Sequence, residues 1–108
     1  MSQPTYTHEA LRIIQEELGW DNPSDDEERL YIAFYALLAL TLGEEVTRSA
    51  IHDAWSLIAV LTSRHSHPSL VPFDELPEHV KALDDPYAEV VKRVARKLRE
   101  KEDRSCAL

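Results

Sequence analysis

The chain has 108 residues, a net charge of −8, one cysteine and two glycines. A single cysteine excludes a disulfide within the chain, and so few glycines argue against a sheet-rich fold and against a glycine-rich phosphate loop. This length suffices for one domain with its own hydrophobic core, and we expect a single domain over residues 1–108.

Charge is divided unevenly along the chain. Residues 1–47 contain ten acidic and two basic side chains, whereas residues 48–108 contain ten of each. Duplex nucleic acid requires a broad basic face, so we expect no binding to it. The basic segment 87–104 suits a phosphate, an acidic partner or the acidic half of a second copy, although a solvated helix face is the commonest meaning of such a segment.

The sequence also bears on the compartment. The N-terminus is polar through Glu9 and lacks the apolar stretch of a secretory signal. The longest apolar run, residues 31–42, is shorter than the ~20 residues that span a bilayer. We therefore expect a cytoplasmic protein with no membrane segment.

A first helix is predicted over residues 6–18. Apolar residues recur there at three- and four-residue steps and form one stripe, Leu11, Ile14 and Leu18. Thr5 or Thr7 is suited to cap its start. Gly19 is suited to end it in a left-handed conformation, after which Trp20 folds back onto the helix.

A second helix is predicted from Ser24 to about Leu42. Ser24 to Glu27 reads as a capping box, in which the serine hydroxyl and the glutamate satisfy the first backbone N–H groups. The later positions leave almost no polar face, and a helix that is apolar all round is buried on several sides. We therefore predict that this helix is central, with the rings of Tyr31 and Tyr35 on one face in the core.

The third helix is expected to begin after the cap Thr47 and to run to about Ser63. Its inward stripe consists of Ile51, Ala54, Trp55, Ile58 and Leu61. His52 lies beside that stripe. Residues 68–77 then hold three of the six prolines, so we expect an extended segment that packs Leu70, Val71 and Phe73 over the bundle.

A short helix over about 77–83 and a last helix, capped by Asp84 or Asp85 with Pro86 just inside it, complete the chain. The last helix has a buried stripe of Tyr87, Val90, Val91, Val94 and Leu98. Beyond about Lys101 we expect a frayed tail. The predicted fold is all-α: a compact orthogonal bundle of four main helices plus one short helix and a proline-rich extended segment.

No catalytic or metal-binding constellation stands out. His52, His65 and His67 lack the spacing of convergent metal ligands, and Ser66 and Ser69 lack a nucleophile elbow. The carboxylates are explained as helix caps and surface residues. We expect no metal, no cofactor and no enzyme activity; the alternative is a small hydrolase-like enzyme that uses His52 and a nearby carboxylate.

The pair His52 and Trp55 leaves two interpretations open. In the structural one, Trp55 anchors the proline segment and the His52 ring bonds a loop carbonyl. In the functional one, a pocket lies between the third helix and residues 70–73. Its aromatic walls are Trp55 and Phe73, its polar groups are His52, Arg64 or His67, and it suits a planar ligand such as a nucleotide base with its phosphate on Arg64.

The ordered set His52-x-x-Trp55, then His67-Pro-Ser-Leu-Val-Pro-Phe-Asp-Glu-Leu76, then a further helix resembles the RyR domain, the repeat named after ryanodine receptors. The resemblance covers about residues 50–95. It implies a non-catalytic, all-helical module, and bacterial versions are proposed to sense small, nucleotide-derived ligands. RyR repeats usually carry a Gly-Trp-x-Tyr-Gly loop before the proline segment. Residues 56–66 lack it, so the resemblance implies a shared scaffold.

The whole chain is also similar to small proteins of actinobacteria and their phages that share the His-Pro-Ser-Leu-Val-Pro-Phe element. This similarity implies a phage or prophage protein that binds a host protein or a small nucleotide-type ligand. We also expect a homodimer. The second helix has more apolar surface than one partner helix covers, and the acidic half and basic last helix are complementary between two copies.

Overall fold

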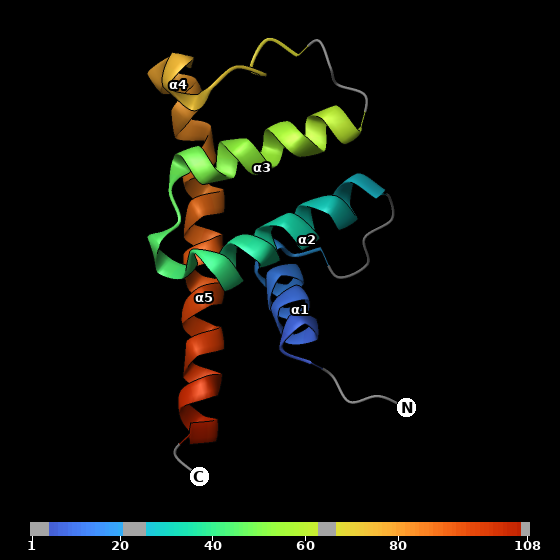
Figure 1. Cartoon of the computed structure of the whole chain (residues 1–108), viewed down its shortest axis with the longest axis vertical. Helices are drawn as coiled ribbons and strands as arrows, with labels where there is room; N and C mark the ends of the chain where they lie inside the picture. Colours follow the sequence, from blue (N-terminus) through green and yellow to red (C-terminus); the bar gives the residue numbers. More distant parts are fainter. Residues whose placement is uncertain (1–4, 21–25, 63–66, 107–108) are drawn as a thin grey trace.

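The computed structural model describes residues 5–20, 26–62 and 67–106, and in these ranges it contains helices and no strand (Figure 1). The predicted all-α fold is confirmed. The α-helices are α1 (Tyr6–Leu18), α2 (Asp26–Thr41), α3 (Arg48–Leu61), α4 (Glu78–Lys81) and α5 (Asp85–Cys106). The short 3-10 turns are η1 (Gly43–Glu45), η2 (Phe73–Glu75) and η3 (Ala82–Asp84).

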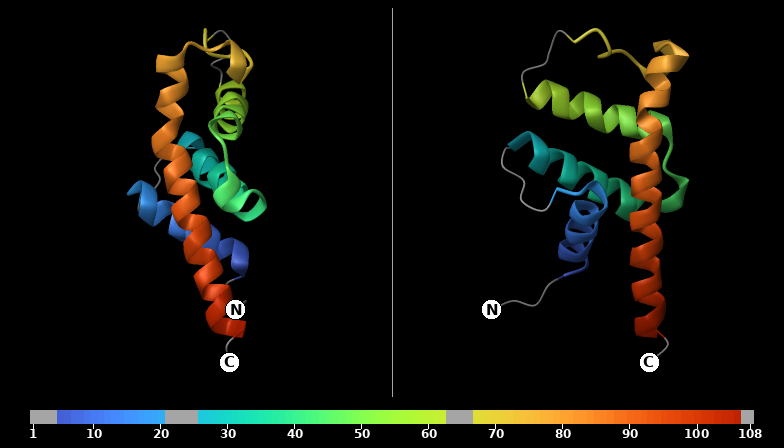
Figure 2. Two further views of the ribbon diagram at one scale, coloured as in Figure 1. Left: turned by 90° about the vertical axis from the view of Figure 1, so that its left-hand side faces the viewer. Right: turned by 180° about the vertical axis from the view of Figure 1, so that it is seen from behind.

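Helix α5 is a central element of the bundle. It contacts α1, α2, α3 and η1, and α2 and α3 lie side by side and cross it steeply (Figures 1 and 2). Its 22 residues extend past the other helices, which gives the molecule its longest dimension of 50 Å against 29 and 20 Å. The beginning of α5 lies beside α3, and this end of the bundle carries the candidate site.

Two of the predicted helix starts and one predicted helix end are confirmed by their caps. The hydroxyl of Thr5 accepts a hydrogen bond from the backbone N–H of His8, and Thr47 caps α3 in the same way. Gly19 ends α1 in the left-handed conformation, with φ 73°, which brings Trp20 back against the core. The capping box predicted at Ser24 lies outside the described residues.

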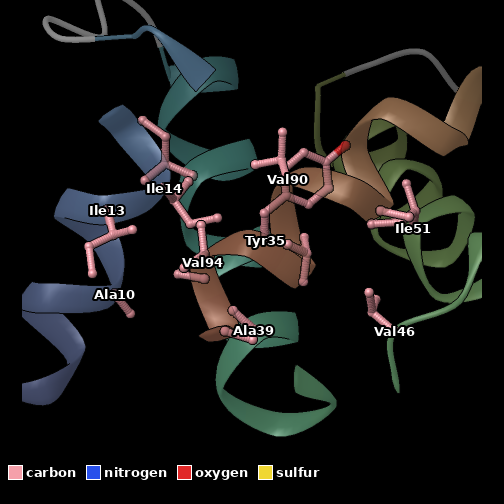
Figure 3. Close-up of a cluster of buried hydrophobic side chains, with 14 of the residues drawn as sticks. Ala10, Ile13, Ile14, Tyr35, Ala39, Val46, Ile51, Val90 and Val94 are labelled. Atoms are coloured by element: carbon pink, nitrogen blue, oxygen red, sulfur yellow. The ribbon is translucent and has the colours of Figure 1, made fainter. Parts of the chain in front are cut away.

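The core is a single apolar cluster where α1, α2, α3 and α5 meet (Figure 3). Among the described residues, the largest fully buried side chains are Tyr35, Ile13, Ile14, Ile51, Ile58, Val91 and Val94. The predicted stripe of α5 is mostly confirmed by the burial of Val90, Val91 and Val94, although Tyr87 is 38% exposed. Burial of these side chains is the main stabilising contribution to a domain of this size.

The second helix was predicted to be central and buried on several sides. Helix α2 contacts α1, α3 and α5, which agrees with that prediction. One stripe of the helix is nevertheless uncovered, because Leu37 and Leu40 are 53% and 38% exposed. The lack of polar residues along α2 did not mark this stripe. Helix α5, whose polar residues had suggested a surface helix, contacts α1, α2 and α3 and is also central.

Two smaller predictions also need correction. His52 is buried, at 3% exposure, instead of lying beside the inward stripe of α3, and Leu61, assigned to that stripe, is 63% exposed. Both shifts follow from a small rotation of the buried face of α3. The backbone of α5 is helical to Cys106, and the expected fraying of the tail stays a prediction.

Several basic residues of α5 pair with acids of the same chain. Glu17 of α1 accepts a hydrogen bond from Arg93 at 3.0 Å and also pairs with Lys97, and these bonds, with Lys97 first, hold the pKa of Glu17 below its ordinary value. Glu44 of η1 pairs with Arg96 and Arg99. The complementarity that we expected between two copies is thus used, at least in part, within one.

Among the described residues, no helix is long and apolar enough to cross a membrane.

Candidate functional site

A cavity of about 370 Å³ lies where α2, α3, η3 and the beginning of α5 meet. Its described lining residues are Trp20, Tyr31, Tyr35, His52, Trp55, His67, Ser69, Val80, Leu83, Asp84 and Tyr87. Clefts of this volume hold small organic ligands, and they are usually apolar with a few placed polar groups. Aromatic side chains supply most of the wall here.

The first wall is a continuous row of four aromatic rings. Trp20 meets Tyr31 edge-on at 6.0 Å between ring centroids, Tyr31 meets Tyr35 at 5.6 Å, and Tyr35 meets Tyr87 at 5.6 Å. Tyr31 and Tyr35 are four residues apart in α2 and therefore share a face. The predicted position of Tyr35 in the core is confirmed, and burial raises the pKa of its hydroxyl far above the ordinary value.

The second wall comes from α3 and the segment that follows it. The rings of His52 and Trp55 stack at 5.6 Å between centroids, and His67 packs edge-on against Trp55 at 5.0 Å. His52 and Trp55 are three residues apart and so lie on one side of the helix. Nε2 of His52 lies 2.7 Å from the carbonyl oxygen of Val71, which fixes the imidazole.

The structure therefore brings together part of the predicted site. His52, Trp55 and His67 line the cavity. Phe73 does not; its ring packs against His52 at 6.1 Å and under the ammonium of Lys81 at 5.2 Å. Arg64 lies outside the described residues.

The functional interpretation placed the pocket between the third helix and residues 70–73, but none of those four residues lines the cavity. The His52–Val71 hydrogen bond and the contact between the rings of His52 and Phe73 hold this segment against α3. The cavity lies instead among α2, α3, η3 and α5. Of the loop before η2, His67 and Ser69 reach it.

Asp84 is the one carboxylate among the described lining residues, and none of them is a lysine or arginine. Burial raises the pKa of Asp84, while the nearby His52 acts in the opposite direction. Arg48 does not pair with it. The Arg48 guanidinium instead forms a two-pronged contact with Asp85, one prong at 2.9 Å, and reaches Glu78 at 2.9 Å.

The local chemistry of His52 opposes a serine nucleophile at this site. Ser56 lies 3.4 Å from Nε2 of His52. A carbonyl oxygen can only accept a hydrogen bond, so Nε2 carries a proton that it donates to Val71. The same nitrogen therefore cannot take the proton of the Ser56 hydroxyl, as a general base would.

Within the described part of the chain, no group of three or more histidine, cysteine, aspartate or glutamate side chains is placed to hold a metal ion.

Sequence reasoning missed most of the first wall and the carboxylate. Tyr31 and Tyr35 were assigned to the core, Trp20 to the end of α1, and Tyr87 to the buried stripe of α5; Asp84 was considered only as a helix cap. Their convergence depends on how α1, α2 and α5 cross, which no local pattern encodes. The available signal was the small number of large aromatic residues. The chain has four tyrosines and two tryptophans, and three of the tyrosines and both tryptophans line this one cavity.

Comparisons with known proteins place this site within a family. No curated protein and no solved structure matches the chain. Residues 5–96 match the family model described as a domain of unknown function, DUF7701, and every described residue of the cavity wall falls within that range. Because the match covers most of the 108 residues, the chain belongs to the DUF7701 family.

Proposed function

We propose that the protein is a non-enzymatic binding module whose cavity holds a small molecule or a single side chain of a partner. The observation that carries this proposal is the cavity of about 370 Å³ with two aromatic walls. Its volume, its aromatic lining and its few polar groups are those of a ligand pocket. Because Nε2 of His52 donates to Val71, it cannot serve as the base for Ser56, which argues against a catalytic His52–Ser56 pair.

The resemblance to RyR domains and to phage proteins suggests a nucleotide-type ligand or a host protein as the partner. A purine or pyrimidine ring stacks on aromatic faces such as that of Trp55, and such stacking needs no particular base.

Chemical-shift mapping of the ¹⁵N-labelled full chain tests the module. We expect a panel of nucleosides, nucleotides and small organic amines to include at least one that shifts signals of the lining residues at millimolar concentration or below. Trp55→Leu should weaken that effect, whereas Leu57→Ala, at an exposed position of the same helix, should not. Shifts that spread over the surface, or none with any compound, would count against a binding cavity.

A small hydrolase remains the second candidate, because His52 and Asp84 line one cavity and interact electrostatically. This function predicts turnover of activated esters or phosphoesters that is lost in Asp84→Asn and kept in Asp74→Asn, an exposed carboxylate of η2. Equal activity in the two variants, or none in the wild type, would argue for the binding module.

A protein partner is supported by apolar side chains left exposed on two neighbouring helices. They are Leu37 and Leu40 of α2 and Leu57, Val60 and Leu61 of α3. We propose that a second copy of the chain covers part of this surface. Light scattering at high protein concentration should give twice the 12.4 kDa chain mass, and Leu37→Glu should shift it toward the single mass. A wild type that stays at 12.4 kDa would rule out the dimer.

A further inference from the structure

We propose that the cavity selects an organic cation, specifically a methylated ammonium group, over neutral and anionic ligands. This inference rests on the proposed function, because it names the chemical class of the ligand that the binding module takes. It follows from the shape of the aromatic wall and from the charges around it.

The aromatic rings of the first wall do not form a flat stack. Neighbouring rings are inclined by 75°, 50° and 37°, so their planes point in different directions. Tyr35 is buried, and the rings with surface left for a ligand are Trp20, Tyr31 and Tyr87. A flat base stacks best between parallel rings. A compact, roughly spherical cation instead gains attraction from the negative face of each ring that it touches, and cages for quaternary ammonium groups use this effect.

The second wall extends the same chemistry. Trp55 is the strongest type of ring for cation–π contact, and it is held by stacking on His52 and by the edge of His67. Because His52 is itself fixed to Val71 at 2.7 Å, the indole is positioned before any ligand arrives. Such preorganisation reduces the entropic cost of binding.

The charges favour the same ligand class. Asp84 supplies a carboxylate to the cavity, and the described wall contains no lysine or arginine to neutralise it. The guanidinium of Arg48, which is close enough to influence Asp84, forms its hydrogen bonds with Asp85 and Glu78. A phosphate placed in this cavity would face a carboxylate, whereas an ammonium group would face its counter-ion. Burial raises the pKa of Asp84, although His52 and Arg48 act in the opposite direction.

A methylated ammonium group has two sources, a free small molecule such as choline or a trimethyllysine side chain of a protein. Both present the same head to the cage. The two are separated by testing choline alone and a short trimethyllysine peptide beside its unmodified lysine counterpart.

Isothermal titration calorimetry of the full chain at pH 8 tests the proposal. The probes are choline and its neutral isostere 3,3-dimethylbutan-1-ol, which differ in charge and hardly in shape. We expect choline, the trimethyllysine peptide or both to bind at least about tenfold more tightly than the isostere and the unmodified peptide respectively, as the sum of several cation–π contacts implies. Equal affinity for choline and isostere would overturn cation selection and leave the binding cavity intact. If nucleosides bind but neither choline nor the trimethyllysine peptide does, cation selection is likewise overturned and the binding cavity stands.

Two variant pairs locate the effect. Asp84→Asn should remove most of the preference for the cation and leave affinity for the isostere unchanged, whereas Asp74→Asn should alter neither. Tyr87→Leu should weaken cation binding several-fold, and Tyr87→Phe, which keeps the ring, should restore it. A cation preference that survives both Asp84→Asn and Tyr87→Leu would place binding elsewhere and overturn the proposal.

Discussion

His52 on α3 donates a hydrogen bond from Nε2 to the carbonyl oxygen of Val71, 2.7 Å away and 19 residues later in the chain. This bond ties α3 to the proline-rich segment. It confirms the structural interpretation of His52, in which the ring bonds a loop carbonyl. The same contact orients Trp55, so one buried imidazole supports both the fold and the cavity wall.

Replacement of His52 by alanine should destabilise the protein by about 1–3 kcal/mol, because the variant loses a buried hydrogen bond and leaves the Val71 carbonyl with no side-chain donor. His52→Gln, which retains a donor, should lose less. Asp53→Ala, at the exposed neighbouring position, is the matched control. Urea denaturation measures the difference; a His52→Ala midpoint equal to that of Asp53→Ala would contradict the assigned role.

Trp55→Ala should cost about 2 kcal/mol of stability, less than a fully buried aromatic would, because one side of the indole faces the cavity and not the core. It should also remove binding of any ligand held by the second wall. Trp55→Phe should recover most of the stability and part of the binding. Thermal unfolding and calorimetry separate the two effects, and a Trp55→Ala protein as stable as wild type would mean that the ring contributes little to packing.

Asp84 gives a prediction about pH. Burial raises its pKa above the ordinary 3.8, so the folded state binds this proton more tightly than the unfolded state does. Stability from this group is therefore greatest below about 3.8 and falls as pH rises through the raised value. Asp84→Asn should consequently raise the melting temperature at pH 7 and have little effect at pH 3. A lower melting temperature at pH 7 would indicate an unrecognised stabilising contact.

The adjacent Asp85 should behave in the opposite way. The hydrogen bonds from Arg48 lower its pKa below 3.8, so its contribution to stability is present at neutral pH and is lost as pH falls through the lowered value. Asp85→Asn should thus lower the melting temperature at pH 7 and leave it unchanged in strong acid. Opposite changes in melting temperature at pH 7 for Asp84→Asn and Asp85→Asn would be difficult to explain by net charge, because both substitutions change the net charge equally.

Glu17→Gln should destabilise the protein by about 1 kcal/mol at pH 7, because its side chain is 15% exposed and its carboxylate pairs with both Arg93 and Lys97. Its pKa is lowered from 4.5, so the loss should disappear as pH falls through the lowered value, where both forms are neutral. Glu16→Gln, whose partner Arg12 lies on the same helix, should change stability less. Equal losses would mean that the contacts with α5 add nothing.

Helix positions were predictable from the sequence because the signals are local. Thr5, Gly19 and Thr47 mark helix ends by their own hydrogen-bonding and backbone preferences, and each acts at the position expected. Burial was less predictable. Leu37 and Leu61 are apolar residues at helical spacing, yet both are more than half exposed, because exposure depends on where neighbouring helices lie.

Only the part of the candidate site that lies on α3 was predictable from the sequence. His52 and Trp55 stand three residues apart on α3, so their proximity follows from helix geometry. Tyr35 and Tyr87 are brought together at 5.6 Å by the crossing of α2 and α5, and Asp84 joins them because α5 begins beside α3. No pattern within a single helix contains that information.

Both tryptophans of the chain line the cavity, one on each of its aromatic walls. The ultraviolet emission of this protein therefore comes almost entirely from around a single site. An occupant, a change in local polarity or a shift of either wall should alter the intensity or colour of that light. Intrinsic tryptophan fluorescence of the native chain therefore reports on the cavity without a label. Substituting Trp20 or Trp55 singly by phenylalanine would leave one tryptophan as a reporter on one chosen wall.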